Sequence, residues 1–286
     1  MMPIKYPPVG NGQCIYCNVP EELSRLDEEH IIAKYLGGKG TLDEASCAAC
    51  SAITSAFEGH CSTDFFESLR AERGLRGRRR KKWTHLPILE ECPPEINDPP
   101  APRKLAKFET PVPTKDYPTI FVLPIFEEPG LLLGKEPSRE YQNVRLSVFQ
   151  VSDRDERVKR LQESGLKGVK IYQEMRIYQF VRMLAKIAHA FAMAEYGARV
   201  FEPLLLPIIL SNDPFGPYLV GGTRGPPVSA DRGMHRVHTE LWDRPDGCFI
   251  LARIRLFGDL SPIIPIYTAV VGRLPERKLR RPLDLT

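Results

Sequence analysis

The chain has 286 residues, 42% of them hydrophobic and 27% charged, which is typical of a soluble globular protein and long enough for two domains. Its net charge of +4 excludes a uniformly polybasic protein, and no apolar run is long enough to cross a bilayer. Seven cysteines in a chain without an apolar N-terminal stretch indicate a reducing compartment. We therefore expect a cytoplasmic protein that makes no contact with membranes.

In chain order, the sequence predicts an α+β protein in which a small cysteine-containing module precedes a larger mixed α/β domain. The proline pairs Pro93-Pro94 and Pro99-Pro100 predict an extended linker between the two, because proline suits neither a helix interior nor a central strand. The expected segments are an irregular lead-in (1–12), the cysteine module with a following helix (13–69), a basic arm (70–86), a proline-rich linker (87–118) and the α/β domain (119–286).

The larger domain has clear secondary-structure patterns but no recognisable chemistry. The patterns predict strands over 119–126 and 144–151, a helix over 171–196 that ends at Gly197, and a hairpin of 248–257 with 263–272. On the long helix, Arg182, Lys186 and His189 recur at helical spacing, and we interpret them as an exposed stripe. Target recognition, ligand sensing and oligomerisation are equally compatible with this domain.

Four cysteines form two matched pairs, Cys14-x-x-Cys17 and Cys47-x-x-Cys50. Two such pairs supply the four thiolates of a tetrahedral structural zinc site. Thiolates are soft ligands, so they favour zinc over Mg²⁺ or Ca²⁺. The alternatives are four unligated thiols or two disulfides. The other three cysteines are most simply free thiols: Cys61, Cys92 and Cys248.

Between the two cysteine pairs lie a histidine and several acidic residues. The pattern predicts a strand that runs into residues 27–32, a loop with Gly37-Gly38, and a helix over 46–58 with Ser46 as its N-cap. His30 then lies at the end of the strand and faces the helix. A neutral imidazole can take a proton from water near pH 7, and the adjacent Glu29 can hold a hard divalent cation beside a phosphate.

This combination of motifs resembles the zinc-stapled HNH endonucleases over residues 13–60, about a sixth of the chain. The resemblance rests on the two cysteine pairs, the run Glu29-His30-Ile31-Ile32 and Gly37-Gly38. It implies a ββα-metal fold and hydrolysis of DNA with Mg²⁺ or Mn²⁺. It also implies that His30 is the general base that activates water and that Glu29 is a ligand of the catalytic metal.

Two positions depart from the HNH pattern. Ser51 follows the last cysteine where the family usually has Asn or His, and Leu42 stands where it usually has Asn. A serine hydroxyl is a poor ligand for a hard dication, so we expect Glu58, rather than Thr54, to complete the metal site. The alternatives are that His30 is an ordinary loop histidine and that the acidic residues are solvated surface groups. The register of the strand decides whether Glu28 or Glu29 faces the metal.

A basic run follows the module. Residues 70–82 hold eight Lys or Arg residues against the single acid Glu72, a local charge of +7. Such a run fits a nucleic-acid partner, DNA more than RNA, although a solvated basic loop is the ordinary alternative. The expected phosphate-binding residues are Arg76, Arg78, Arg79, Arg80, Lys81 and Lys82.

The sequence as a whole predicts a metal-dependent HNH-type endonuclease that hydrolyses phosphodiester bonds in DNA. The alternative is a catalytically inactive zinc module that binds nucleic acid or a protein without cleaving it. In a third interpretation residues 119–286 are the active part and the zinc module only docks them, but no catalytic set in that domain supports it.

Overall fold

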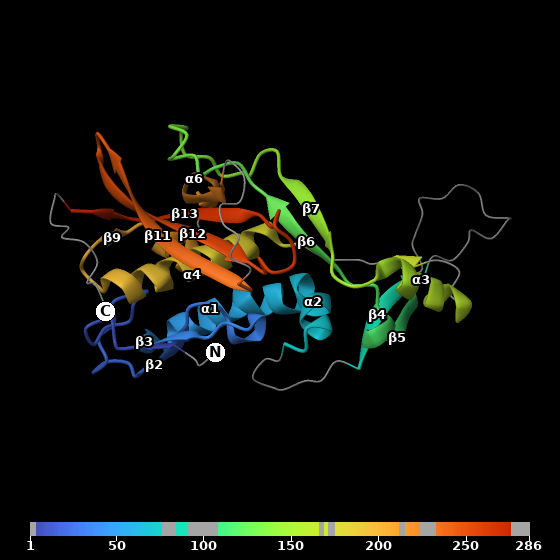
Figure 1. Ribbon diagram of the computed structural model, residues 1–286. Helices are drawn as coiled ribbons and strands as arrows, with labels where there is room; N and C mark the ends of the chain where they lie inside the picture. Colours follow the sequence, from blue (N-terminus) through green and yellow to red (C-terminus); the bar gives the residue numbers. More distant parts are fainter. Residues whose placement is uncertain are drawn as a thin grey trace, which may run out of the picture.

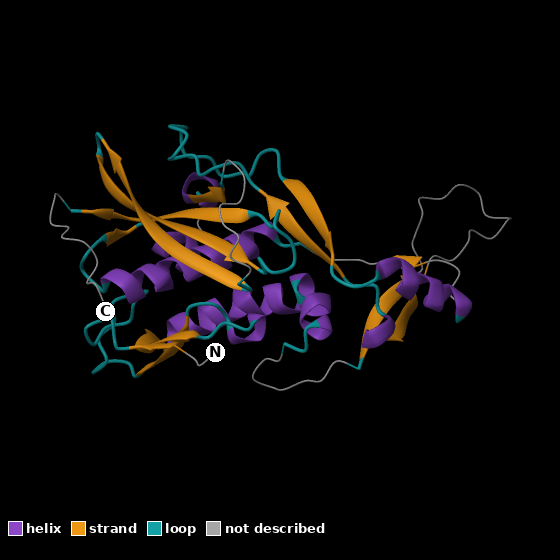
Figure 2. Ribbon diagram, viewed as in Figure 1, coloured by secondary structure: helices purple, strands orange, loops and turns teal. Residues whose placement is uncertain are grey.

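A computed structural model describes residues 4–75, 84–90, 108–165, 169–170, 175–211, 215–223 and 233–275. The expected α+β class is confirmed: helices and mainly antiparallel strands pack in layers, and one long helix, α4 (Ile177–Tyr196), lies in the middle (Figures 1 and 2). Helix α1 (Ala48–His60) packs on one side of α4 and the large sheet on the other. No helix of the described ranges is both long and apolar enough to cross a membrane.

The N-terminal unit is a small sheet followed by a helix, and its first strand lies within residues 1–12, which were expected to be irregular. Strands β1 (Ile4–Tyr6), β3 (Gly40–Cys47) and β2 (Leu26–His30) lie side by side, with β3 parallel to β1 and antiparallel to β2. Between β2 and β3 the chain forms the short helix η1 (Lys34–Leu36), which ends at Gly37 with a φ of 85°. Glycine adopts this left-handed conformation without a steric penalty, so the turn needs it.

The start and the continuation of α1 differ from expectation. Its N-cap is Cys47 rather than Ser46, whose hydroxyl instead donates to the Cys47 carbonyl at 3.4 Å. Ser46 belongs to β3, because pairing with β2 continues to the end of that strand. The helix expected to follow the cysteine module is divided into a π-helical turn, η2 (Cys61–Phe65), and α2 (Glu67–Glu72).

The large sheet is antiparallel throughout its described pairs. Its strand order is β10 (Val220–Gly222), β13 (Ile266–Leu274), β12 (Gly247–Leu256) and β11 (His235–Arg244), and β9 (Glu202–Pro203) also pairs with β13. The expected hairpin is therefore present as β12 and β13. The antiparallel pairing makes this half α+β, rather than α/β with a parallel sheet.

Helix α4 is buried on nearly its whole circumference, because it lies between α1 and the large sheet. It begins at Ile177, after Met175 and Arg176, which were expected to be helical, and it ends at Gly197, as expected, with a φ of 77°. Two short helices, α5 (Leu206–Ser211) and α6 (Gly216–Leu219), follow it. The ring of Phe180 on α4 lies 5.0 Å from that of Phe65 and 5.2 Å from that of Tyr267, centroid to centroid. One hydrophobic core thus joins the cysteine module to the large sheet.

The segment expected to be an extended linker has strands at both of its ends. β4 (His85–Glu90) pairs with β5 (Phe108–Pro113) and, through Leu89 and Glu90 only, with β8 (Val169–Lys170). Pro87 is tolerated in β4 because β8 does not pair beside it. The double prolines themselves lie outside the described residues.

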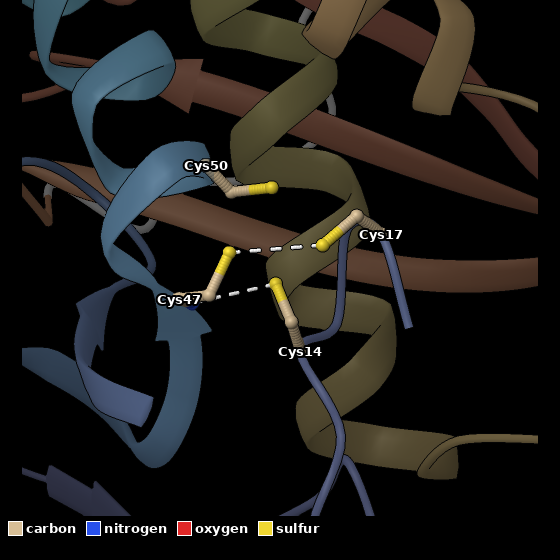
Figure 3. A group of neighbouring side chains, drawn as sticks. All are labelled: Cys14, Cys17, Cys47 and Cys50. Atoms are coloured by element: carbon tan, nitrogen blue, oxygen red, sulfur yellow. Dashed lines mark hydrogen bonds between the residues drawn. The ribbon is translucent and has the colours of Figure 1, made fainter. Parts of the chain in front are cut away.

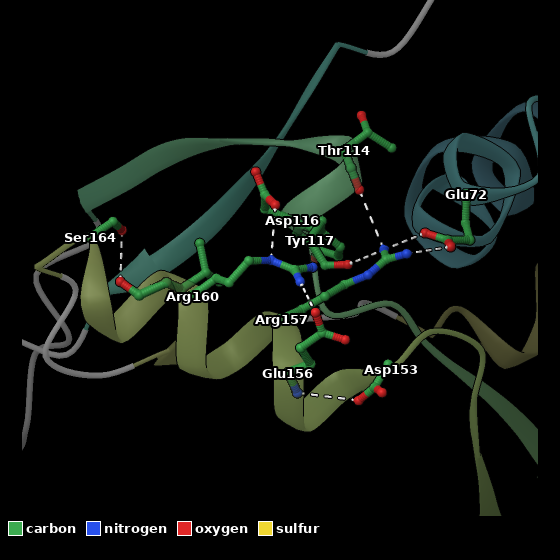
Figure 4. Close-up of polar contacts among 10 residues, drawn as sticks. Glu72, Thr114, Asp116, Tyr117, Asp153, Glu156, Arg157, Arg160 and Ser164 are labelled. Atoms are coloured by element: carbon green, nitrogen blue, oxygen red, sulfur yellow. Dashed lines mark hydrogen bonds and ion pairs between the residues drawn. The ribbon is translucent and has the colours of Figure 1, made fainter.

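A further hairpin and a helix connect these strands to the rest of the chain. β6 (Ile120–Ile125) pairs with β7 (Arg145–Gln150), which confirms both expected strands. The short helix η3 (Thr114–Asp116) precedes this hairpin in the sequence, and α3 (Arg154–Glu163) follows it. Arg157 of α3 forms a two-pronged ion pair with Glu72 of α2, at 2.7 and 2.8 Å, and donates to the Tyr117 carbonyl at 2.9 Å (Figure 4). This pair attaches the outlying strands to the helices of the cysteine module.

Candidate metal centre and histidine site

The four paired cysteines converge on one point. Cys14 and Cys17 come from the loop before β2, while Cys47 and Cys50 come from the junction of β3 and α1 (Figure 3). Their sulfur atoms all lie within 4.8 Å of one another, and three of the four residues are buried. Sulfur ligands 2.3 Å from a tetrahedral zinc ion lie about 3.8 Å apart, so the cluster can hold zinc.

Disulfides do not explain this cluster. The Sγ atoms of Cys17 and Cys47 are 3.6 Å apart, far longer than a covalent bond, and all four cysteines are free. Burial raises the pKa of the Cys14 and Cys50 thiols, and a bound dication would offset this by stabilising the thiolates. The Cys47 amide also donates to Cys14 Sγ at 3.4 Å, a hydrogen bond that favours a thiolate.

His30 lies at the end of β2, as expected, and its side chain is 24% exposed. Nε2 lies 3.8 Å from Glu28 Oε1, and Nδ1 is buried without a hydrogen-bond partner among the described residues. Burial lowers the pKa of His30, an effect that Glu28 partly opposes, so the imidazole is neutral at pH 7. A neutral, partly exposed imidazole can accept a proton from water.

Glu29 and Glu58 are brought together, but around a lysine. The ammonium of Lys186, on α4, lies 2.7 Å from Glu29 Oε1 and 3.0 Å from Glu58 Oε1, and it also donates to the His30 carbonyl. Lys186 is completely buried and Glu29 nearly so. Burial alone would lower the pKa of Lys186, but the two carboxylates raise it, so the residue remains charged.

The strand register separates the two neighbouring acids. Glu28 lies beside the His30 ring, whereas Glu29 turns to the buried Lys186, as the alternation of side chains along a strand requires. Burial raises the pKa of Glu58, and Lys186 counteracts this. The hydroxyl of Tyr16 is also buried here without a partner in the described part of the chain. Burial first, and then the charges of Glu29 and Glu58, raise its pKa.

Neither of the two residues that depart from the HNH pattern offers a strong ligand for a hard dication. Leu42 is completely buried opposite Glu29 on β3. Ser51 lies in the first turn of α1, where its carbonyl accepts a hydrogen bond from the Thr54 hydroxyl at 3.2 Å. Thr54 is buried as well.

The basic run is only partly described. Arg76, Arg78, Arg79, Arg80, Lys81 and Lys82, which we expect to bind phosphates, lie outside the described residues. The first two basic residues have structural partners: Arg70 donates to the Tyr35 carbonyl at 3.2 Å and is buried, and Arg73 forms an ion pair of 2.6 Å with Asp259.

Lys186 is the site residue that sequence reasoning missed. The expected exposed stripe is wrong, because Lys186 and His189 are both buried and only Arg182 is partly accessible. A signal was present in the sequence: apart from Arg182 and His189, every residue within four positions of Lys186 is apolar. A buried lysine needs carboxylate partners, and the module supplies them.

The donor sets fit the two expected metals differently. The four sulfur atoms suit zinc, as described above. A hard dication does not fit between Glu29 and Glu58, because the fully buried Lys186 ammonium already lies there. Comparison of the chain with protein-family models, with curated proteins and with solved structures gave no significant match.

Proposed function

We propose that the chain is an HNH-type nuclease that hydrolyses phosphodiester bonds in nucleic acid, with DNA as the expected substrate. The observation that carries the proposal is His30, a neutral and partly exposed histidine at the end of β2, in a two-strand-and-helix unit joined by the four-cysteine cluster. Zinc at that cluster would be structural, because four thiolates leave no open coordination position.

In the proposed reaction, His30 removes a proton from the water that attacks the phosphate. Nε2, beside Glu28, is the ring atom that would accept that proton, because Nδ1 is buried. Of the acids near the ring, the exposed Glu28 would hold Mg²⁺ or Mn²⁺, which would stabilise the charge that develops on the phosphate. The basic run would hold the nucleic-acid backbone.

A second candidate function is a zinc module that binds nucleic acid or a protein without cleaving it. The occupation of the Glu29–Glu58 pair by Lys186 favours this alternative, because no dication can then bind both carboxylates. Ser51 in place of an amide or imidazole ligand points the same way.

Nicking of supercoiled plasmid by the zinc-loaded protein, with and without added Mg²⁺ or Mn²⁺, separates the two candidates. We expect His30→Ala to lower the cleavage rate by a factor of about 100 or more, which is the usual contribution of a general base. His238→Ala is the matched control, because His238 is an exposed histidine on β11, outside the module. Cleavage by His30→Ala at the wild-type rate would contradict the proposal, and DNA binding without any cleavage selects the second candidate.

A further inference from the structure

A lysine from the second half of the chain completes the buried part of the histidine site. Three oxygen atoms surround Lys186 Nζ: Glu29 Oε1 from β2, Glu58 Oε1 from α1 and the backbone carbonyl of His30. The contact with the His30 carbonyl is a hydrogen bond, and the contacts with the two carboxylates are ion pairs. Both carboxylates belong to the zinc module, and the only described cation between them comes from α4.

We propose that Lys186 is a positioning residue: its ammonium takes the place of a divalent cation at the Glu29–Glu58 pair and holds the end of β2 that carries His30. The positioning role rests on the proposed nuclease function, whereas the occupation of the carboxylate pair by an ammonium does not. The proposal also gives a role to the second half of the chain, for which the sequence suggested none.

Electrostatics explains why the pair takes an ammonium. Two carboxylates shielded from water repel each other strongly, so they require a positive charge between them. A magnesium ion would have to keep several water ligands in an octahedral arrangement. Lys186 has no exposed surface, and the side chains of Glu29 and Glu58 are only 8% and 14% exposed, so there is little room for such a hydrated ion. An ammonium on an apolar stem meets the same requirement without water.

The contact with the His30 carbonyl links this buried charge to the partly exposed ring. Glu29 and the His30 backbone are adjacent along β2, and Lys186 binds both of them. The ring of His30 projects to the other side, beside Glu28. Loss of the ammonium should therefore displace the end of the strand and, with it, the imidazole.

The first test measures the binding of Mn²⁺ to the zinc-loaded protein by electron paramagnetic resonance. We expect Glu29→Gln and Glu58→Gln to bind the same amount of Mn²⁺ with the same affinity as the wild type, because neither carboxylate is a ligand. If the wild type binds no Mn²⁺, we expect both variants to bind none. A tenfold or greater loss of affinity in either variant would overturn the proposal. This result does not depend on whether the protein cleaves DNA.

The second test compares Lys186→Met/Glu58→Gln with Lys34→Met. The double variant removes the positive charge of Lys186 together with the negative charge of Glu58, so that Glu29 and Glu58 are not left as two carboxylates without a cation between them. Lys34 is an exposed lysine near His30, so its substitution removes a nearby charge without touching the His30 carbonyl. We expect the carbonyl ¹³C resonance of His30 to shift in the double variant and to stay unchanged in Lys34→Met. An unshifted resonance in the double variant would overturn the contact.

Cleavage by the same two variants tests positioning. We expect the double variant to lose at least tenfold in the rate of the chemical step, with DNA affinity unchanged, while Lys34→Met keeps that rate. A shifted resonance with full cleavage would overturn the positioning role. If the wild type does not cleave, the proposed function has failed, and the Mn²⁺ and carbonyl measurements still decide the role of the ammonium.

Discussion

Lys186 and His189 lie one turn apart on α4, and both bind backbone carbonyls of the cysteine module. Lys186 reaches His30, and His189 Nε2 lies 2.8 Å from the Ile15 carbonyl. A neutral histidine can donate this hydrogen bond from Nε2, which leaves Nδ1 without a partner in the described part of the chain. Burial lowers the pKa of His189 to about 4. Lys186 is therefore buried in its charged form, whereas His189 is buried in its neutral form.

The neutral state of His189 predicts an acid-sensitive contribution to stability. Its pKa is about 4 when folded and about 6.5 when unfolded, so the unfolded chain binds more protons between these values. The contribution is complete above pH 6.5, is lost as the pH falls towards 4, and amounts to about 3 kcal/mol. We expect denaturant unfolding to show that the wild type loses this much more stability than His189→Gln between pH 6.5 and 4.

The comparison with His189→Gln removes other acid effects. Protonation of the zinc-binding cysteines destabilises both proteins equally, because glutamine changes no sulfur ligand. Glutamine can still donate a hydrogen bond to the Ile15 carbonyl but does not titrate. Parallel stability curves for the two proteins over this pH range would show that His189 is not the cause.

Sequence patterns predicted the site residues that are recognisable from their spacing along the chain. The two cysteine pairs converge as expected, and His30 lies at the end of its strand. Lys186 could not be placed, because it is more than a hundred residues away from Glu29 and Glu58 and only the packing of α4 brings it there. The choice between Glu28 and Glu29 likewise required the register of β2, which the structure supplies.

Elements with a strong local pattern were predicted well, and those that depend on partners were not. The strands β6 and β7, the helix α4 and the hairpin of β12 with β13 follow their hydrophobic patterns. β4 contains a proline and becomes a strand because β5 pairs with its whole length. Ser46 had the residue type of an N-cap, but strand pairing extended past it.

Zinc at the cysteine cluster would connect two segments of the chain. It would join the loop with Cys14 and Cys17 to the junction of β3 and α1 at Cys47 and Cys50. We expect one zinc per chain by elemental analysis, and almost none in a variant with Cys50→Ser. Structural zinc contributes about 10–16 kcal/mol in isolated zinc-finger peptides. The loss here should be smaller, because the module also packs on α4.

Thermal unfolding measures that loss. We expect Cys50→Ser, or addition of a strong chelator to the wild type, to lower the melting temperature by at least 10 °C, since even a few kcal/mol shift it by several degrees. Cys248→Ser is the control, because Cys248 is a free cysteine on β12 and not part of the cluster. Equal zinc content in both variants would contradict a four-cysteine site.

The molecule as a whole is not a zinc module joined by a linker to an independent domain. Its largest core runs without interruption from the cysteine module through α4 to the large sheet. Phe180 is the centre of this contact, with Phe65 on one side and Tyr267 on the other. Arg182 adds a contact over the ring of Phe57, at 4.7 Å from its centroid. Hydrophobic periodicity cannot reveal such packing, because it shows which face is apolar but not what covers it.

A shared core predicts that zinc release and unfolding of the large sheet occur together. In a Trp83→Phe background the remaining tryptophan, Trp242, lies on β11 and reports on the sheet, while a chromogenic chelator reports on zinc. We expect both signals to have the same denaturant midpoint, as two-state unfolding requires.

Two substitutions test the shared core further. Phe180→Ala should move both midpoints together, because it removes about 3–5 kcal/mol of stability. Ile263→Ala, at a strongly exposed position, is the control and should change stability by about 0.5 kcal/mol or less. Release of zinc at a lower denaturant concentration than the Trp242 transition would show that the module unfolds separately, and the coupling through α4 would then be wrong.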